Sequence, residues 1–354
     1  MSSHDRYRPL AAISNPPNPF LHGHLEWDGP PPEVALEIYR DSSKSIISRN
    51  ESPDIPFSYS VNPYRGCMHA CAYCYARPTH EYLDFGAGTD FDRKIVIKED
   101  AAALLREAFE QKSWKGEMIV FSGNTDCYQP LEATYGLTRA CLEVCAEYRN
   151  PVSIITKSAI VARDVDVLAE LVAVADCWVT ISVPFWDPVA ARAVEPFAPT
   201  PQRRIKAIAA LAKAGIPVGV NIAPVIPGLN DQDVVRILEA AADAGAQRVG
   251  MTMVRLPGPV GPVFEQRIRA AFPDRADKIL HRIEDARGGK RNESRFGARM
   301  TGTGRYWGVI EQLVDSACRR LGLTRGTVEA MIGSERPTFQ RPPRPSAQLE
   351  LFPR

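Results

Sequence analysis

The sequence predicts an α/β protein built on a partial (β/α)6 barrel of the TIM type, and two observations support this prediction. First, six short apolar segments with the composition of strands alternate with segments of helical periodicity between residues 57 and 254. Second, five of these six segments are followed by a helical segment, which is typical of parallel strands joined by right-handed crossovers. We therefore expect chemistry-bearing residues at the carboxyl ends of the strands, where the loops of a parallel barrel gather.

Each predicted element has a local signal in the sequence. Short apolar or alternating runs indicate strands, and apolar residues spaced three or four apart, such as Leu105 and Phe109, indicate helices. Gly215 and Gly245 come directly after two predicted helices, at the position where glycine commonly ends a helix. In chain order, the predicted strands cover residues 57–62, 117–121, 151–156, 177–183, 217–223 and 248–254, and the predicted helices cover residues 99–111, 131–148, 161–174, 202–214 and 231–244.

Segments of different composition flank the predicted barrel. Residues 1–56 are rich in Pro, Asn and charge, so we expect an extended N-terminal arm before a barrel over residues 57–260. Residues 261–333 form a predicted helical extension that is basic, because seven Lys or Arg stand against three Asp or Glu between Arg282 and Arg305. Residues 334–354 are rich in Pro and Arg, which predicts a disordered tail.

The overall composition narrows the class of protein. The 354 residues suffice for one large domain with appendages, and the net charge of +1 provides no global field toward nucleic acid or membrane. The sequence contains no apolar run long enough to span a membrane, so we expect no membrane association. The eight cysteines come without a secretory signal, which favours a reducing compartment and hence a cytoplasmic protein.

Three cysteines are the main candidates for metal chemistry. Cys67, Cys71 and Cys74 follow the first predicted strand closely, after Gly66, which allows a sharp turn. Clustered thiolates select zinc, copper(I) or iron–sulfur clusters, and a [4Fe–4S] cluster normally takes four cysteines. Three cysteines would leave one iron open to a substrate or cofactor. The alternative is a structural zinc site that His69 completes as a Cys3His set.

The spacing Cys-x3-Cys-x2-Cys, with the aromatic Tyr73 before the last cysteine, resembles the motif of the radical S-adenosylmethionine (SAM) superfamily. This resemblance implies a [4Fe–4S] cluster on Cys67, Cys71 and Cys74, with SAM chelated to the open iron. In that superfamily the reduced cluster cleaves SAM to a 5′-deoxyadenosyl radical, which abstracts a hydrogen atom from the substrate. The resemblance therefore also implies an external electron donor.

Polar residues follow the later predicted strands. Asp126 could pair with the ammonium group of SAM, although Asp at this position is equally typical of a turn before a helix. Lys157 could bind the SAM carboxylate, and Ser182 could bind a ribose hydroxyl. The exposed backbone of residues 221–231 could hold adenine.

Together these segments resemble one branch of the superfamily, the spore photoproduct lyase-like proteins, which are often labelled DNA repair photolyases. The resemblance covers residues 57–255. By that resemblance, the residues that line the SAM site are Tyr73, Thr125, Asp126, Lys157, Ser182 and Ala223. We therefore expect a lyase-like radical SAM enzyme that acts on DNA or on a nucleotide lesion.

One position departs from the pattern of that branch. The subgroup with established lyase chemistry uses a cysteine hydrogen donor two residues before its Ser/Thr-Asp pair, and this sequence has Gly123 there. Cys127 lies nearby, but on the other side of Asp126. The hydrogen donor and the other catalytic residues therefore stay unassigned.

A short motif near the C-terminus suggests a protein partner. Its residues Gln348, Leu349, Leu351 and Phe352 resemble the peptide by which bacterial replication and repair proteins bind the DNA sliding clamp. Apolar side chains could fill a pocket on the clamp while the glutamine hydrogen-bonds beside it. The alternative is a tail that folds back on the domain.

Two other functions remain open at this point. The chain could be a non-catalytic metal-binding adaptor at the sliding clamp, or a radical SAM enzyme that acts on a protein or a metabolite, because a fold does not determine a substrate. The identity of the metal and the turnover of SAM distinguish the adaptor from an enzyme. Detecting the products formed from SAM in the presence of each candidate substrate distinguishes the possible substrates.

Overall fold

The computed structural model describes residues 10–11, 13, 15–20, 33–326 and 337–343, so the clamp-like motif at residues 348–352 lies outside the described residues. Within them, the largest sheet has eight strands, and all neighbouring strands are parallel except β4 and β5. In spatial order the strands are β4 (Ile47–Arg49), β5 (Tyr59–Val61), β8 (Ile119–Phe121), β9 (Val152–Thr156), β10 (Cys177–Ser182), β11 (Val218–Val225), β12 (Arg248–Met253) and β13 (Thr324–Arg325).

The six predicted strands are confirmed as the consecutive parallel strands β5 and β8 to β12. The sheet does not close, because β4 and β13 form its two edges, so the partial (β/α)6 barrel is also confirmed. Apolar residues occupy paired positions on neighbouring strands. Ile154, Val179 and Val218, for example, lie side by side and are fully buried. The carboxyl ends of the parallel strands therefore meet at one edge of the sheet.

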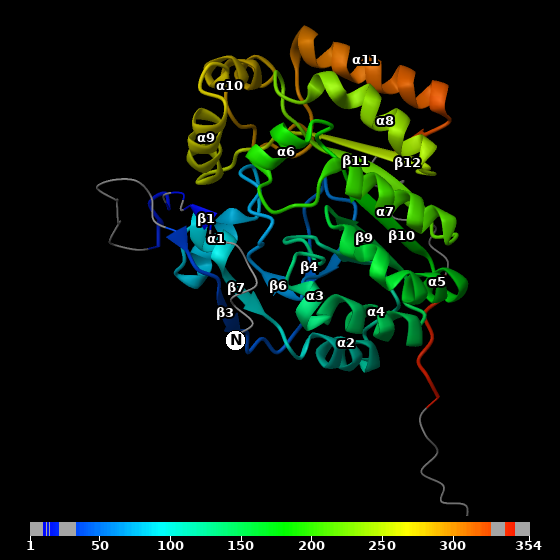
Figure 1. The fold of residues 1–354 in the computed structure, drawn as a ribbon. Coiled ribbons are helices and arrows are strands. Elements are labelled where there is room, and N and C mark those ends of the chain that lie inside the picture. Colours follow the sequence, from blue (N-terminus) through cyan, green and yellow to red (C-terminus); the bar gives the residue numbers. More distant parts are fainter. Residues whose placement is uncertain (1–9, 12, 14, 21–32, 327–336, 344–354) are drawn as a thin grey trace, which may run out of the picture.

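Helices pack along the outer side of this sheet (Figure 1). The predicted helix over residues 131–148 is wrong in one respect, because Gly136 adopts a φ of +62° and divides it into two helices. The predicted helix over residues 161–174 begins with a 3-10 turn, η3 (Ala159–Asp164). The helices are α2 (Ala101–Glu110), α3 (Glu132–Tyr135), α4 (Leu137–Glu147), α5 (Val165–Val174), α7 (Pro201–Lys213) and α8 (Val234–Asp243).

A second, smaller sheet lies beside the first and was not predicted. It has three strands in the order β3 (Glu37–Arg40), β7 (Lys94–Ile97) and β6 (Tyr64–Arg65). The 3-10 helix η2 (Arg77–Leu83) and helix α1 (Thr89–Arg93) connect β6 to β7 after the cysteine segment. The predicted N-terminal arm therefore supplies β3 to this sheet and β4 to the larger one. It also supplies the short antiparallel pair β1 (Leu10–Ala11) and β2 (Glu33–Val34).

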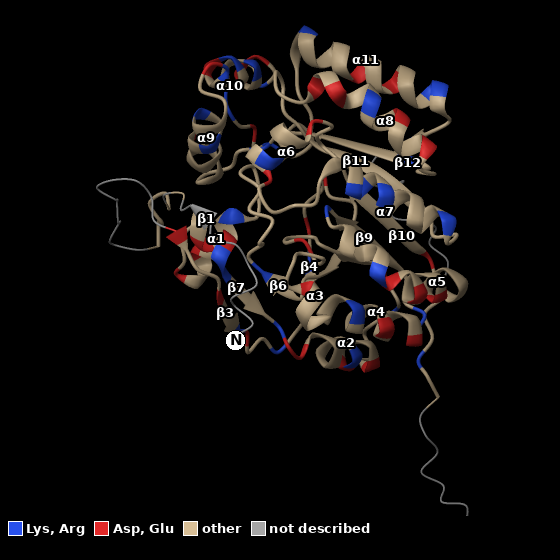
Figure 2. Ribbon diagram, in the orientation of Figure 1, with Lys and Arg blue, Asp and Glu red and all other residues tan. Residues whose placement is uncertain are grey.

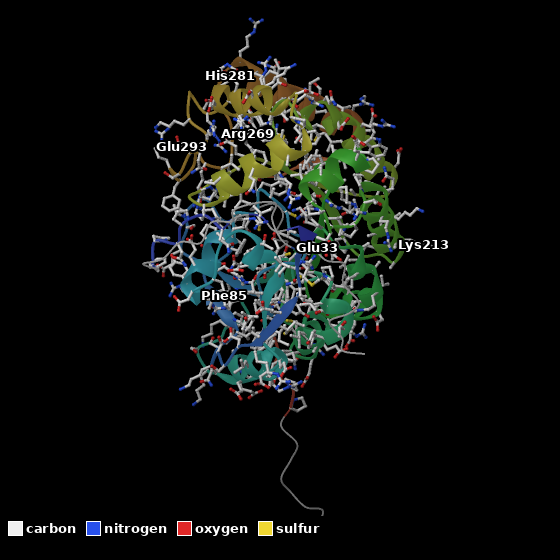
Figure 3. The ribbon with its side chains drawn as sticks, turned by 60° about the vertical axis from the view of Figure 1, so that its left-hand side comes forward. Glu33, Phe85, Lys213, Arg269, His281 and Glu293 are labelled. Carbon is white, nitrogen blue, oxygen red and sulfur yellow. The ribbon has the colours of Figure 1, made fainter. Side chains whose placement is uncertain are left out.

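The described part of the C-terminal extension is largely helical, and its surface carries both signs of charge (Figure 2). Arg269 pairs with Glu265 and Asp277, and it faces outward on the same side of the molecule as His281 (Figure 3). None of the described helices has the length and apolarity needed to cross a membrane. The helices of this part are α9 (Val260–Ala271), α10 (Ala276–Asp285) and α11 (Gly304–Leu321), and the short α6 (Pro188–Val194) packs against α9.

Residues 337–343, inside the predicted disordered tail, are packed against the domain. Phe339 stacks on Tyr148 with ring centroids 6.3 Å apart and meets Phe109 edge-on. The Arg341 guanidinium donates to three backbone carbonyls at the end of α2, including that of Gln111 at 2.7 Å. The prediction of disorder is therefore wrong for this segment.

Candidate active site

The cysteine loop, residues 67–74, follows β6 at the edge where the large sheet presents the carboxyl ends of its strands. Gly66 adopts a φ of +77°, and a Cβ there would lie 2.8 to 2.9 Å from His80, Ile95 and the Phe91 carbonyl. Only glycine fits this turn, because the left-handed backbone and the close neighbours both disfavour a side chain. The turn therefore sets the direction in which the cysteine loop leaves β6.

Arg77, at the start of η2, stabilises the backbone of the cysteine loop. Its buried guanidinium donates to the Cys71 carbonyl at 2.9 and 3.1 Å and to the Ala87 and Gly88 carbonyls. It also pairs with the buried Asp92 at 2.8 Å. Burial raises the pKa of the Asp92 carboxyl to about 6, although Arg77 opposes this rise.

Gln129, which follows β8, holds the other end of the loop. Its amide accepts a hydrogen bond from Met68 N and donates one to the Gly66 carbonyl, both at 3.0 Å. The backbone N–H of Ala72 donates to the Val194 carbonyl of α6 at 3.0 Å. Arg77 and Gln129 could not be predicted from the sequence, because a side chain that binds backbone groups has no motif of its own.

The three cysteines are free thiols on one loop; Cys67 and Cys71 are buried and Cys74 is partly exposed. Burial raises the pKa of each thiol, and the charge of Cys74 adds to the rise at the other two. A bound metal would reverse this effect, because thiolates are the metal-binding form.

His69 Nδ1 lies 3.3 Å from Asp126 Oδ2, which leaves Nε2 as the nitrogen that a metal would bind. In the described part of the chain, no three His, Cys, Asp or Glu side chains are arranged to hold a single metal ion. In a [4Fe–4S] cluster each cysteine binds a different iron, so the thiols need not converge on one point. As three free thiols on one short loop, Cys67, Cys71 and Cys74 are the kind of donor set that such a cluster takes, and their role as its ligands stays a prediction.

Asp126 lies between the cysteine loop and the end of β9. Its carboxylate accepts hydrogen bonds from the Thr156 hydroxyl at 2.6 Å, the Lys157 N–H at 2.8 Å and the Tyr128 N–H at 2.9 Å. Burial alone would raise the pKa of Asp126, but His69, the Lys157 N–H and the Thr156 hydroxyl lower it to about 2. Its oxygens are therefore engaged by the protein, as the turn interpretation expects.

Tyr73, Lys157 and Ser182 are brought together by a buried network. The Tyr73 hydroxyl donates to Glu195, which pairs with Arg204. Arg204 donates to the Ser182 carbonyl at 3.0 Å, and the Lys157 ammonium lies 5.6 Å from the Tyr73 ring centroid. Burial raises the pKa of Glu195 while Arg204 lowers it. Arg204 was missed by the sequence analysis, because its contacts join distant segments.

Thr125 and Ala223 lie at two other strand ends. The buried Thr125 hydroxyl donates to the Tyr64 carbonyl at 2.7 Å, so it holds the end of β8 against β6. Ala223 precedes Pro224 in a cis peptide bond, and Asn230 donates to the Pro224 carbonyl at 3.0 Å. The predicted SAM residues therefore all lie at or near the carboxyl ends of β8 to β11 or on the cysteine loop.

Gly123, at the end of β8, packs tightly against β5. A Cβ at this position would lie 2.8 Å from the Cβ of Ser60. A cysteine would therefore require Ser60 to move. Cys127 is buried, and the pKa of its thiol is raised well above the usual range by burial.

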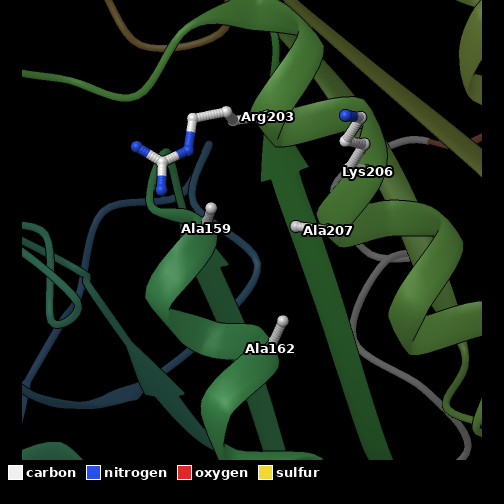
Figure 4. A pocket seen from close by; sticks show the side chains of 5 residues that line it. All are labelled: Ala159, Ala162, Arg203, Lys206 and Ala207. Carbon is white, nitrogen blue, oxygen red and sulfur yellow. The ribbon is translucent and has the colours of Figure 1, made fainter.

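A separate cavity of about 210 Å³ lies between η3 and α7 (Figure 4). Alanine side chains face the gap between the two helices, and Arg203 and Lys206 stand at its rim. None of the predicted site residues lines it. We do not assign this cavity to the candidate active site.

The chain is similar to proteins of several organisms. It is 40% identical over 222 residues to an uncharacterised protein of Mycobacterium tuberculosis, which is 62% of this chain and 65% of that relative. It is 31% identical over 200 residues to an uncharacterised protein of Methanocaldococcus jannaschii, covering 56% of this chain and 72% of that relative. The aligned region thus spans just under two thirds of the mycobacterial protein.

Among solved structures, the fold is similar to that of a spore photoproduct lyase bound to AdoMet and a dinucleoside spore photoproduct. The TM-score is 0.58 at 14% sequence identity, over 82% of this chain and 81% of the lyase. The sequence model of the radical SAM superfamily matches residues 61–241, which include the cysteine loop and the strand ends described above. Because this match covers more than half of the chain, the protein belongs to the radical SAM superfamily.

Proposed function

We propose that this enzyme holds a [4Fe–4S] cluster on Cys67, Cys71 and Cys74, binds SAM beside it, and acts on DNA or a nucleotide. The observation that carries the proposal is the cysteine loop itself. Its three free thiols project from a backbone that Arg77 and Gln129 hold in place. When bound and reduced, the cluster supplies the electron that cleaves SAM, and an external donor must provide that electron.

The surrounding residues bind and position SAM in this proposal. Lys157 supplies a cation near Tyr73 for the SAM carboxylate, and Ser182 and Ala223 line the ribose and adenine part of the site. Thr125 lines the same site from the end of β8. Asp126 acts through its neighbours, because it fixes the Lys157 backbone and His69 rather than presenting a free carboxylate.

The proposal of a nucleic-acid substrate is supported by a similarity of fold. The similar spore photoproduct lyase binds a dinucleoside photoproduct, and the likeness to it is one of fold. Gly123 and the tight packing of Ser60 against it argue against a cysteine donor at that position. We therefore propose nucleic-acid chemistry of the lyase-like kind without repair through a cysteine at position 123.

The test is an anaerobic reconstitution with iron and sulfide, followed by a dithionite-driven assay for 5′-deoxyadenosine. We expect about four irons per chain and product formation in the wild type. Cys71→Ala should lose both, whereas the matched control Cys141→Ala, a buried cysteine of α4, should keep both. One tightly bound zinc and no SAM cleavage would instead support the adaptor. Product formed only with a protein or metabolite would overturn the nucleic-acid substrate.

We also propose the DNA sliding clamp as a partner, through the motif of residues 348–352. Residues 337–343 are packed on Tyr148 and the end of α2, so they tie the chain to the domain shortly before the motif. A peptide of residues 344–354 should bind the clamp, and a peptide with Leu351→Ala and Phe352→Ala should not. Equal binding of the two peptides, or none by either, would contradict this partner.

A further inference from the structure

Two arginines flanked by two aromatic rings form a row beside the candidate active site: Tyr75, Arg255, Arg299 and Phe296. Tyr75 follows the last cysteine, and its hydroxyl donates to the Gly123 carbonyl at 3.1 Å. The Arg255 guanidinium lies 6.0 Å from the Tyr75 ring centroid, and that of Arg299 lies 4.6 Å from the Phe296 ring centroid. The two arginines are neighbours, because the Arg255 guanidinium contacts the sulfur of Met300, the residue after Arg299, at 3.7 Å.

The charge of this row is only partly neutralised. Arg299 forms a paired contact with Asp54, including a hydrogen bond of 2.7 Å from Nε. The Nη1 of Arg255 meets only the sulfur of Met300, at 3.7 Å, and its buried Nε has no hydrogen-bond partner among the described residues. Arg287 nearby donates to backbone carbonyls, such as that of Val254 at 2.8 Å. Arg255 therefore has hydrogen-bonding capacity left for an anion.

The rings at the two ends of the row are open to solvent. Tyr75 is 49% exposed and Phe296 is 59% exposed. Each of these exposed rings lies beside an arginine, so the row offers flat aromatic faces next to positive charge. Exposed rings bind unpaired bases by stacking, and guanidinium groups bind the phosphates between them.

We infer that this row binds a single strand of nucleic acid, with bases stacked on Tyr75 and Phe296 and a phosphate on Arg255. A duplex keeps its bases stacked inside, so only a single strand or an extruded nucleotide uses both kinds of contact. A peptide would offer no phosphate to Arg255. The inference rests on the proposed function only for the role of the strand as substrate; the binding itself does not require SAM.

Fluorescence anisotropy with a labelled oligothymidylate tests this inference on the reconstituted enzyme. Phe296→Ala should weaken binding about tenfold or more, because one stacked base is lost. Arg255→Gln should weaken binding and lower the slope of log Kd against log salt by about 0.7, the effect of one phosphate contact. The matched controls are Phe20→Ala and Arg320→Gln, two exposed side chains elsewhere, which should bind as the wild type does.

The outcomes separate this inference from the proposed function. No binding of oligothymidylate, or equal binding by Phe296→Ala and Phe20→Ala, would overturn the row as a binding surface even if SAM is cleaved. Tighter binding of a duplex than of the single strand would also overturn it. Single-strand binding that depends on Phe296 and Arg255 would support it even if the enzyme cleaves no SAM.

Discussion

The cysteine loop, residues 67–74, follows β6, and the loop before α11, residues 286–303, hydrogen-bonds to the end of β12 through Met300, but the two loops are stabilised differently. The cysteine loop is largely buried, and Arg77, paired with buried Asp92, holds its backbone. The second loop is mostly exposed and contains several glycines, and Arg287 holds it through backbone carbonyls without a hydrogen-bonded carboxylate. In the proposed function the first loop holds the cofactor, and in the further inference the second contributes Phe296 to the binding of a single strand.

This difference has a physical reason. Cysteine ligands must be held in one arrangement, and buried hydrogen bonds to the backbone achieve that. A loop that meets a large substrate needs exposed rings and charges, which add little to folding. Changes in the first loop should therefore lower stability and iron binding, whereas changes in the second should chiefly affect substrate binding.

The largest expected effect follows from Arg77→Met. This change removes five hydrogen bonds and leaves Asp92 buried without its partner. We expect a loss of about 3–5 kcal/mol in the free energy of unfolding and a lower iron content after reconstitution. Urea unfolding and iron analysis measure both.

The control for this variant is Arg40→Met, an exposed arginine that pairs with Glu99 on the surface. This variant should unfold at a urea concentration close to that of the wild type. Adding Asp92→Asn to Arg77→Met should recover part of the loss. If Arg77→Met unfolds at the wild-type urea concentration, Arg77 does not hold the cysteine loop.

A second prediction concerns pH and His80, whose ring lies against Gly66. Burial lowers the pKa of His80 to about 4. Between the usual pKa of about 6.5 and this value, the unfolded chain binds a proton that the folded protein does not bind, so stability falls as pH falls. The titration of His80 should lower the free energy of unfolding by about 2 kcal/mol between pH 7 and pH 5.

Urea unfolding of the wild type and of His80→Gln at both pH values isolates this contribution. Asp92, whose pKa is about 6, changes stability in the opposite direction, but it is common to both proteins. The variant should therefore lose less stability than the wild type on acidification. An equal loss in the two proteins would show that His80 is not the group that titrates.

The smallest expected effect is that of Arg287→Met in the second loop. Its guanidinium binds the carbonyls of Val254, Ala298, Arg299 and Thr301, of which several are partly open to water. We expect a loss of about 1 kcal/mol, faster amide exchange in residues 298–301 and an unchanged iron content. Loss of iron from this variant would show that the two loops are not independent.

Several features could be predicted from the sequence because their signals are local. The six parallel strands and the cysteine motif are contained in short segments of characteristic composition. The sheet of β3, β7 and β6 was missed because its strands are short and β3 pairs with a strand more than fifty residues away. The helix over residues 131–148 was misjudged because the apolar pattern continues through Gly136.

The sequence by itself determined the order of strands and helices, the three cysteines and the polar residues at the strand ends. The tertiary structure alone decided which groups hold them: Arg77 on the Cys71 carbonyl, Gln129 on Met68, and Arg204 between Glu195 and Ser182. It also decided that Arg255 lies between Tyr75 and Met300, the residue after Arg299. Such contacts join distant segments, and hydrogen bonds to backbone groups need no particular partner residue, so they leave no pattern in the sequence.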